Sequence, residues 1–282
     1  MKSSLKTILA LAGLTIGSFA LASSQPAKAA SAISGTTDCP ASGNSSAISS
    51  DCYATPDELK VTFYEMGFCT SDPLTTDTFN STNCQKGWEN SSGQTIDIAN
   101  CLTIDCNLDT GKNYRVDNAT YTHAYAIMDS SQTVKGRAYY NDKTYYTTAT
   151  DRVHPSTGKL NGAVPSTDSA DFAANTQVVD EMGGGDGCWD WEQSTTKGTV
   201  KAVLTNSSLV TATNASTCSS SARLVGSVQM SSSLTMTNAV SGYKMTWHVT
   251  NLGMFVDSWT GKSPDNVYSM EAGPFVPSFE LR

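Results

Sequence analysis

Hydrophobic and polar residues alternate in short segments along most of the chain from residue 53 onward. In residues 59–66 the alternation places Leu59, Val61 and Phe63 on one face, and residues 95–99 repeat the pattern. A period of two residues is typical of a strand with one buried face, because successive side chains of an extended chain point to opposite sides. The pattern therefore predicts a fold that is built from β-strands.

Similar segments recur to the end of the chain, and further strands are predicted at residues 121–128, 199–204, 208–213, 224–230, 234–237, 244–250, 254–259 and 275–281. The tyrosine pairs at 139–140 and 145–146 flank a polar turn, which predicts a hairpin with the pairs facing each other. Residues 151–171 are predicted as loop, and residues 172–182 as the one short helix. Short strands separated by turn residues predict an all-β fold, a disulfide-stabilised antiparallel β-sandwich or an irregular barrel.

The first 29 residues have the pattern of a secretory signal peptide. Lys2 and Lys6 precede a run of small apolar residues, and Ala27-Lys28-Ala29 matches a cleavage site. A membrane anchor is the alternative, but it needs about twenty strongly apolar residues, and this run is interrupted by Thr, Ser and Gly. We therefore expect a signal peptide (1–29), a flexible Ser/Gly-rich arm (30–51) and a single β-rich domain (52–282).

The charge of the chain excludes one class of partner. The sequence has 18 Lys and Arg residues against 26 Asp and Glu residues, a formal net charge of −8. Removal of residues 1–29 takes away three lysines and no acid, which leaves 15 basic and 26 acidic residues and a net charge of −11. Binding to a nucleic-acid backbone needs a basic surface, so nucleic acid is not an expected partner. Beyond residue 29 no segment is apolar enough to predict a membrane span, and we expect a secreted protein.

All eight cysteines follow the predicted cleavage site, at positions Cys39, Cys52, Cys69, Cys84, Cys101, Cys106, Cys188 and Cys218. An even number of cysteines in an exported chain indicates disulfides, because export delivers thiols to an oxidising compartment. Eight cysteines allow 105 connectivities, and we favour the nearest-neighbour scheme, in which 39 pairs with 52, 69 with 84, 101 with 106 and 188 with 218. A cysteine metal site is disfavoured, since the chain has no Cys-x-x-Cys motif.

A loop between the predicted strands resembles a calcium-binding loop. Asp105, Asn107 and Asp109 place oxygen atoms at positions 1, 3 and 5, as in an EF-type loop. Thr110 stands where the loop has its glycine, and Val116 stands where it has a bidentate glutamate. The segment is therefore either a calcium site or a polar turn, and no cofactor is required by any other feature of the sequence.

Aromatic residues suggest where a ligand could stack. Trp189 and Trp191 lie in an acidic segment, and Tyr140 and Tyr145 lie in the predicted hairpin. These four rings could bind a glycan, or the tryptophans could cover one end of the core. Asp190 and Glu192, the acids beside the tryptophans, are the one acid/base pair that we would assign to a hydrolase.

Catalytic sequence motifs do not support an enzyme. The chain lacks Gly-x-Ser-x-Gly, His-Glu-x-x-His and a phosphate-binding glycine loop. The alternation in residues 121–128 places His123 on one face with Tyr121, Tyr125 and Ile127, and we interpret it as a hydrogen-bonded strand residue rather than a base.

The N-terminal third of the mature chain resembles a pattern found in uncharacterised secreted proteins of aquatic bacteria. The residues that carry the resemblance are Cys52-Tyr53, Thr55-Pro56, Lys60-Val-Thr62, Tyr64-Glu65, Cys69-Thr70, Asp97-Ile-Ala99 and Tyr121-Thr-His123. The resemblance implies a bacterial protein that is exported to the cell surface or the medium, and it implies no activity.

Three classes of function remain. A structural or surface-assembly protein would pair its sheet edges with other copies of itself or with cell-surface components, using the N-terminal arm or residues 275–281. A glycan- or surface-binding module would use the aromatic residues, and a secreted hydrolase would use Asp190 and Glu192. We favour the first class, and expect no enzyme.

Overall fold

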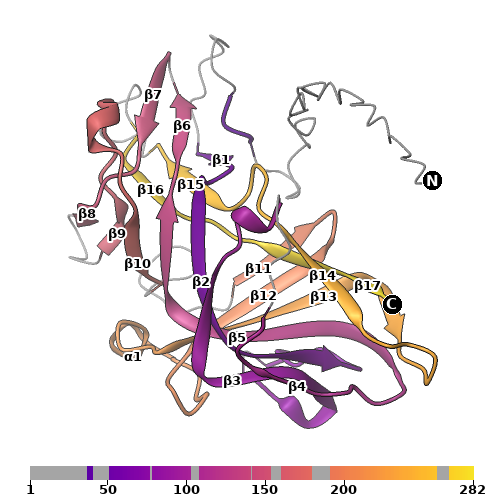
Figure 1. Cartoon of the computed structure of the whole chain (residues 1–282). Coiled ribbons are helices and arrows are strands. Elements are labelled where there is room, and N and C mark those ends of the chain that lie inside the picture. Colours follow the sequence, from indigo (N-terminus) through magenta and orange to yellow (C-terminus); the bar gives the residue numbers. More distant parts are fainter. Residues whose placement is uncertain are drawn as a thin grey trace, which may run out of the picture.

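The computed structural model of the chain describes residues 37–40, 51–76, 78–102, 108–140, 142–153, 160–179, 191–258 and 267–282. Within these ranges the chain forms mainly antiparallel β-structure, as predicted (Figure 1). The described helices are each three or four residues long: η1 (Ser81–Asn83), η2 (Asn100–Leu102), η3 (Ser169–Asp171) and α1 (Ala215–Cys218). The predicted signal peptide and most of the predicted arm lie outside the described residues.

An eight-stranded sheet forms one layer of the fold. Its strands are β2 (Glu58–Cys69), β3 (Cys84–Asp97), β4 (Lys112–Asn113), β5 (Thr120–Lys135), β10 (Asn175–Val178), β11 (Trp191–Thr195), β12 (Gly198–Thr205) and β13 (Arg223–Thr235). The order is β11-β12-β13-β5-β2-β3-β4. The 16-residue strand β5 pairs with β2 on one side, and on the other side with β13 in its first half and β10 in its second.

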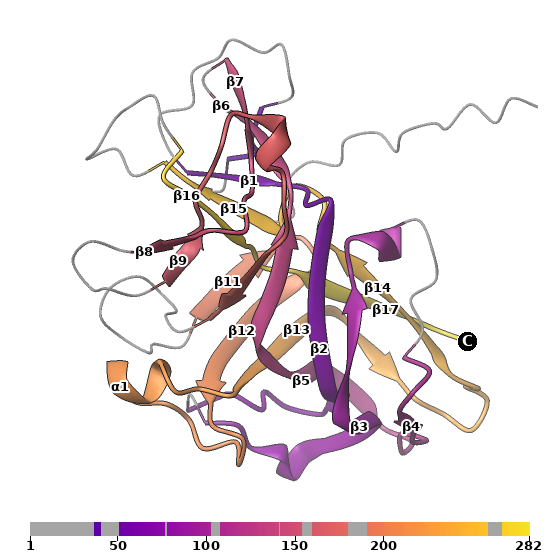
Figure 2. The same ribbon diagram turned by 60° about the vertical axis from the view of Figure 1, so that its left-hand side comes forward.

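The opposing layer consists of a five-stranded sheet and a two-stranded ribbon. The five-stranded sheet, in the order β1-β15-β16-β9-β8, contains β1 (Cys52–Ala54), β8 (Asp151–Val153), β9 (Leu160–Ala163), β15 (Met254–Asp257) and β16 (Ser269–Ala272). The ribbon pairs β14 (Tyr243–His248) with β17 (Val276–Leu281) and crosses the eight-stranded sheet (Figure 2). A separate hairpin pairs β6 (Arg137–Tyr140) with β7 (Lys143–Tyr146). Within the described residues the sheets do not close, so the architecture is sandwich-like and not a barrel.

Aromatic side chains fill the space between the layers. On β2, Leu59, Val61 and Phe63 are buried together, which confirms the predicted core face of this strand. The ring of Phe63 lies 5.1 Å from the ring of Trp247 in the ribbon, centroid to centroid. Further along β2 the ring of Phe68 packs edge-on against Tyr243, at 4.9 Å. Burial of such large side chains is the main source of stability in a fold of this kind.

The prediction of a helix at residues 172–182 was wrong, because its described part contains strand β10. The Gln177 side chain explains the difference: its Nε2 donates to the Met270 carbonyl oxygen, and its Oε1 accepts from the Ala272 amide. The side-chain amide thus acts like one more peptide group beside β16. These contacts with a distant segment override the local helix preference, and no sequence window includes them.

Other boundaries also differ from the prediction. Residues 151–171 were predicted as loop, but they include β8 and β9. Residues 208–213 were predicted as a strand, but they form a turn in which Thr211 makes one isolated bridge with Thr205. The two strands predicted at 224–230 and 234–237 are one strand, β13, whose register with β5 shifts between Gln229 and Leu234. Each difference lies where pairing with another strand, rather than local alternation, decides the structure.

Candidate functional site

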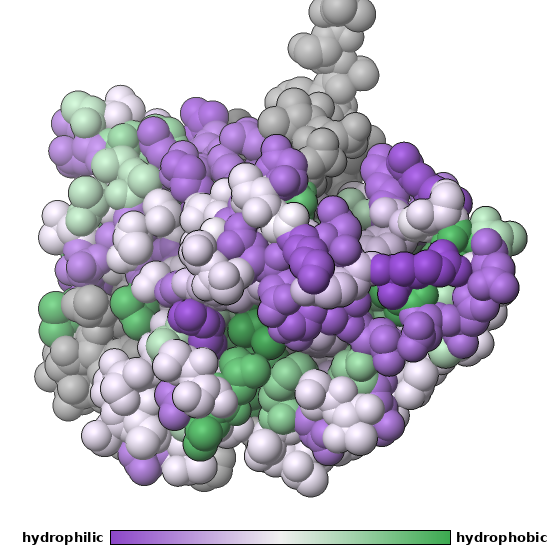
Figure 3. All heavy atoms as spheres, turned by 60° about the horizontal axis from the view of Figure 1, so that its bottom comes forward, coloured by the Kyte–Doolittle hydropathy of each residue, from purple (hydrophilic) through white to green (hydrophobic). Residues whose placement is uncertain are grey.

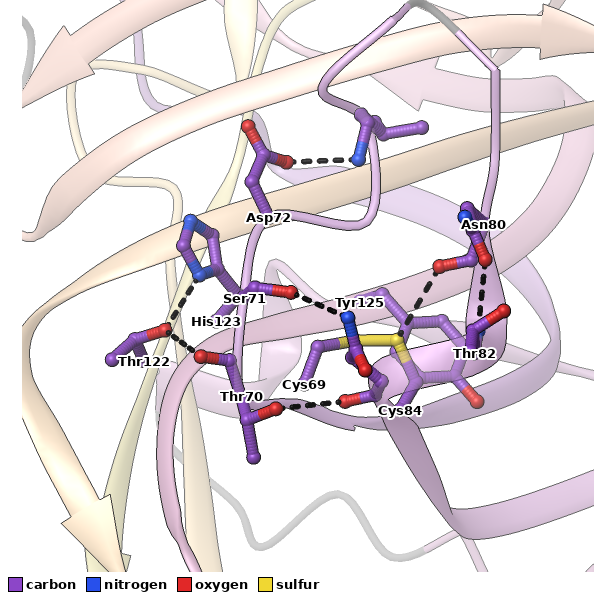
Figure 4. The surroundings of a disulfide bond; sticks show 12 residues. Cys69, Thr70, Ser71, Asp72, Asn80, Thr82, Cys84, Thr122, His123 and Tyr125 are labelled. Atoms are coloured by element: carbon purple, nitrogen blue, oxygen red, sulfur yellow. Dashed lines mark hydrogen bonds between the residues drawn. A yellow bond between two sulfur atoms is a disulfide. The ribbon is translucent and has the colours of Figure 1, made fainter.

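A disulfide links the last residue of β2 to the first residue of β3. Cys69 and Cys84 are directly opposite each other in the ladder, and their disulfide closes the segment of residues 70–83 (Figure 4). We call this segment the disulfide-closed loop. The Thr70 amide donates to the Asn83 carbonyl oxygen at 3.0 Å, and the Asn83 side chain donates to the Ser71 hydroxyl at 3.0 Å. The loop is therefore held at its base by covalent and hydrogen bonds together.

A small hydrophobic cluster lies beneath the loop, on the outer face of the sheet. Leu74 of the loop is only 2% exposed. It shares this cluster with Tyr125 and Ile127 of β5 and with Val203 and Val225 of the two neighbouring strands. This cluster is separate from the core between the layers, so the eight-stranded sheet buries hydrophobic side chains on both of its faces.

Asp72 ties the loop to the sheet electrostatically. Its Oδ1 accepts from the Leu74 amide at 2.8 Å, and its Oδ2 lies 2.8 Å from the Lys201 Nζ on β12. Lys201 Nζ also lies 3.4 Å from the Glu192 carboxylate on β11. Burial by itself would raise the pKa of the Asp72 carboxyl, but the bonds from Lys201 and the Leu74 amide outweigh it and lower that pKa. Asp72 is thus held ionised and in place.

His123 lies beside this ion pair on β5, and its tautomer follows from its contacts. The Thr122 hydroxyl donates its one hydrogen to the Thr70 carbonyl oxygen at 3.1 Å. The His123 Nδ1, 2.9 Å from the same hydroxyl oxygen, must therefore be the donor in that pair (Figure 4). Burial lowers the pKa of His123, with Asp72 opposing that shift and Lys201 adding to it. His123 is thus a buried strand residue with a hydrogen bond to Thr122, as predicted.

A second polar network lies on the same face, at the other edge of the cluster. The Tyr125 hydroxyl donates to Glu65 Oε1 at 2.7 Å, and Lys86 Nζ lies 2.7 Å from Glu65 Oε2. Lys86 also contacts Glu89 at 2.7 Å, and Glu89 accepts from the Tyr114 hydroxyl at 2.7 Å. Burial and the bond to Glu65 raise the pKa of Tyr125 far above its usual value. The phenol is therefore a permanent donor.

The strand register brings these groups into one row on the outer face. From one side of the sheet to the other, the row is Glu192, Lys201, Ser227, Tyr125, Gly67 and Lys86. Gly67 allows the Tyr125 ring to lie across β2, because a Cβ at this position would be 2.7 Å from the Tyr125 Cε1. Each carboxylate of the two networks is bound by a lysine or a hydroxyl, an arrangement that anchors the loop and stabilises the sheet.

The edges of the sheets are the second feature that bears on function. The strand β11 pairs with β12 on one side, and no described residue pairs with its other side. The last strand, β17, is paired with β14 of its own chain, and its second residue is Pro277. The described part of the arm is also paired internally: the Cys39 amide donates to the Tyr53 carbonyl oxygen, and the Cys39–Cys52 disulfide lies beside it. The two segments that we expected to join a neighbour's sheet thus each have a partner within the chain, while the second side of β17, like that of β11, has none among the described residues.

The disulfide prediction is confirmed for two pairs, Cys39–Cys52 and Cys69–Cys84. Cys101 and Cys218 are also disulfide-bonded. Cys106 and Cys188 lie outside the described residues, so the pairs predicted for them stay predictions.

The two hairpin tyrosines do not form a surface. Tyr140 is 1% exposed and Tyr145 is 4% exposed, and both belong to the core between the layers. The hairpin is where it was predicted, but Tyr140 lies opposite Lys143, and Tyr145 lies opposite Ala138. The expectation that the tyrosine pairs face each other was wrong, because the register sets them off from one another, and the burial of Tyr140 and Tyr145 in the core leaves neither ring available for stacking.

The other predicted site residues are only partly described. Of the calcium loop, Asp105 and Asn107 lie outside the described residues, and Asp109 is exposed with its Oδ1 bound by the Gln94 side chain at 3.0 Å. Trp189 and Asp190 also lie outside, and Trp191 begins strand β11. Calcium binding and tryptophan stacking therefore stay predictions.

Sequence reasoning did not find Asp72 or Lys201. The spacing of Cys69 and Cys84 indicated a closed loop, but it did not indicate which part of the sheet the loop would contact. The two residues are 129 positions apart, and only the fold brings them together.

Comparison with known proteins adds no relative. No helix in the described part of the chain is long and apolar enough to cross a membrane. Searches against protein-family models, curated proteins and solved structures find no match.

Proposed function

We propose that the chain is an exported structural or surface-assembly subunit of a bacterial cell exterior, which associates with other copies of itself through the edge of β11. The observation that carries this proposal is the outer side of β11, which has no partner strand among the described residues. An unpaired strand edge is a row of amide and carbonyl groups that can bind a second strand.

The sequence of β11 suits antiparallel pairing with a copy of itself. Its residues, Trp-Glu-Gln-Ser-Thr, include neither proline nor glycine. A register centred on Gln193 places Glu192 opposite Ser194 of the second copy, so that no like charges meet. Such pairing would join two eight-stranded sheets into one continuous sheet.

Two other edges, those of β17 and β4, are less suited to pairing. Pro277 in β17 has no amide hydrogen to donate, and proline in an edge strand is a common protection against association. At the far edge of the large sheet, β4 has only two residues, one of which is Lys112. This difference favours β11 over the last strand as the assembly edge.

Export is supported by covalent structure. Two disulfides join pairs of described cysteines, and Cys101 and Cys218 are disulfide-bonded as well. Such bonds persist in oxidising compartments outside the cytosol. The signal-peptide pattern of residues 1–29 points to the same route.

Association of the purified mature chain, residues 30–282, tests the proposal. Analytical ultracentrifugation and electron microscopy over a range of protein concentrations, with and without calcium, should detect dimers or longer assemblies. In a two-residue hairpin the closing pair, here Thr195 and Gly198, is hydrogen-bonded, so the Ser194 amide points to the outer edge. Ser194→Pro should therefore abolish association without removing a backbone bond to β12; it loses only the 3.5 Å contact between the Ser194 and Thr199 hydroxyls. Ser194→Thr keeps a hydroxyl and should associate like the wild type. Strictly monomeric wild type, or association that survives Ser194→Pro, would contradict the proposal.

A further inference from the structure

A row of aromatic and charged side chains crosses the outer face of the five-stranded sheet. Tyr53, Phe255 and Glu271 are directly opposite one another on β1, β15 and β16. The pairing of Met270 with Ala163 places Gly162 of β9 next in the row. Arg152 of β8 follows, and its side chain reaches the Tyr268 carbonyl oxygen beside β16. We call Tyr53, Phe255, Glu271, Gly162 and Arg152 the outer row.

The outer row lies on the face of the sheet opposite its fully buried residues, and of its members Tyr53 also packs against a core cluster, the one that contains Leu252. The alternate residues of the same strands, among them Cys52, Met254 and Met270, are fully buried against the eight-stranded sheet. The large side chains of the row, in contrast, are partly exposed. Alternation of this kind leaves one side of the sheet to the core and the other to a partner or to solvent.

One end of the row is an aromatic surface. The rings of Tyr53 and Phe255 lie 5.2 Å apart, centroid to centroid, with an angle of 48° between their planes. Burial raises the pKa of Tyr53, and the nearby carboxylates of Asp51 and Glu271 raise it further. The hydroxyl therefore stays protonated and can donate a hydrogen bond at the rim of the aromatic surface.

The other end of the row is polar, and its groups are held in place. The Ser269 hydroxyl donates to Glu271 Oε1 at 2.6 Å. Gly162 has a positive φ of 70°, and a Cβ there would lie 2.4 Å from the Glu271 Cγ. Glycine is thus required for Glu271 to lie across β9. The Arg152 guanidinium is fixed by its bond to Tyr268 and lies 4.9 Å from the centre of the Tyr268 ring.

We propose that the outer row is a binding site for an uncharged pyranose glycan. The hydrogen-bearing face of a pyranose ring can pack on Tyr53 and Phe255, while Glu271 accepts and Arg152 donates hydrogen bonds with ring hydroxyls. Apolar walls with a few fixed polar groups are the usual composition of a small-molecule site. Acidic glycans are disfavoured, because Asp51, Asp257 and Glu271 lie around the row and the mature chain carries a net charge of −11.

Binding to a panel of soluble neutral and acidic oligosaccharides, measured by calorimetry with the mature chain, tests this proposal. We expect a neutral oligosaccharide to bind and Phe255→Leu to weaken it about tenfold or more, because the apolar volume stays but the flat ring is lost. Glu271→Gln keeps the shape of the side chain and should weaken binding about threefold. Leucine is chosen over alanine at position 255 because its larger side chain keeps more of the packing, so that a loss of binding is not caused by misfolding.

The chain contains a matched control. Tyr146 and Phe172 form another partly exposed aromatic pair, 5.4 Å apart at 57°, and neither belongs to the outer row. Phe172→Leu should leave glycan binding unchanged. The proposal is overturned if no neutral glycan binds, if only acidic glycans bind, or if Phe255→Leu and Phe172→Leu have equal effects. The site is independent of association through β11, so Ser194→Pro should still bind.

Discussion

The outer face of the eight-stranded sheet and that of the five-stranded sheet each carry a row of side chains that crosses the strands and includes one glycine. On the larger sheet the disulfide-closed loop covers a hydrophobic cluster next to the row, and one salt bridge, between Asp72 and Lys201, binds the loop to the sheet. On the smaller sheet the outer row consists of partly exposed aromatic and charged groups. The outer face of the larger sheet is partly covered by a loop of the same chain, whereas the outer row of the smaller sheet leaves aromatic and charged side chains partly exposed.

The contrast teaches what the large sheet needs for stability. A sheet that is hydrophobic on both faces must be covered twice, and here the ribbon and the smaller sheet cover one face while the loop covers part of the other. In Figure 3, which views the molecule from the lower end of Figure 1, apolar surface forms a band between hydrophilic side chains. Covering by a loop is less complete than covering by a sheet. Mutations in the loop therefore test most directly whether this face of the larger sheet depends on its cover.

The largest effect is expected from removing the disulfide of the loop. A bond that closes 15 residues contributes about 3 kcal/mol in the loop-entropy model, so Cys69→Ala with Cys84→Ala should lower the free energy of unfolding by about that amount. Denaturant unfolding measures the change, and hydrogen exchange should show faster exchange in residues 70–83. A loss below about 1 kcal/mol with unchanged exchange would mean that the loop does not depend on its cross-link.

Leu74→Ala tests the hydrophobic cover itself. Truncating a buried leucine costs about 2–5 kcal/mol, and we expect about 2 kcal/mol because a loop can partly close the cavity. Val210→Ala is the control, since Val210 is 62% exposed and should change stability by less than about 0.5 kcal/mol. Equal effects of the two substitutions in denaturant unfolding would show that the loop is not a packed cover.

Gly162→Ala tests whether the outer row of the five-stranded sheet depends on its glycine. The positive φ and the close approach of the Glu271 side chain should together reduce stability by about 1–2 kcal/mol and displace Glu271. Gly242→Ala is the matched control, because a Cβ there meets nothing within 4 Å. If both variants unfold at the same denaturant concentration as the wild type, Glu271 does not depend on the glycine.

The smallest effect is a dependence of stability on pH. The pKa of His123 is lowered in the folded protein, so folding favours the neutral ring. The stability that this provides is present above the usual pKa of 6.5 and is lost as the pH falls below it. Asp72, whose pKa is also lowered, adds a further loss at lower pH, as its carboxylate is protonated below 3.8. Burial also lowers the pKa of His248, so thermal unfolding of His123→Gln should show a smaller step below pH 6.5 and an unchanged acid step. A step of undiminished size would assign it to His248 alone.

Much of the fold could be predicted from the sequence, because alternation is a local signal. The face of Leu59, Val61 and Phe63 was predicted and is buried. The face proposed for residues 121–128 was only partly right: Tyr125 and Ile127 share one cluster, but Tyr121 belongs to another. The register shift near Tyr121 comes from extra residues in β13, between Gln229 and Leu234, and it brings Leu234 opposite Tyr121, with which it shares its cluster.

The sites were harder to predict than the strands. The rings of Tyr140 and Tyr145 are in the core, whereas Tyr53 and Phe255, which are 202 positions apart, form the partly exposed pair. Exposure of an aromatic ring depends on what packs above it, and the residue type carries no information about that. The row on the larger sheet likewise depends on the order of six strands.

The sequence by itself determined the acidic charge and predicted the β-strand content, since these depend on simple counts or on neighbouring positions. It favoured, among many connectivities, two disulfide pairs that the structure confirms. The tertiary structure decided which strands pair, that a predicted helix is a strand, and that Asp72 meets Lys201 across 129 positions. The physical reason is that a strand satisfies its hydrogen bonds on another segment of the chain, so its neighbours, and the surface they form, are set by pairing over long distances.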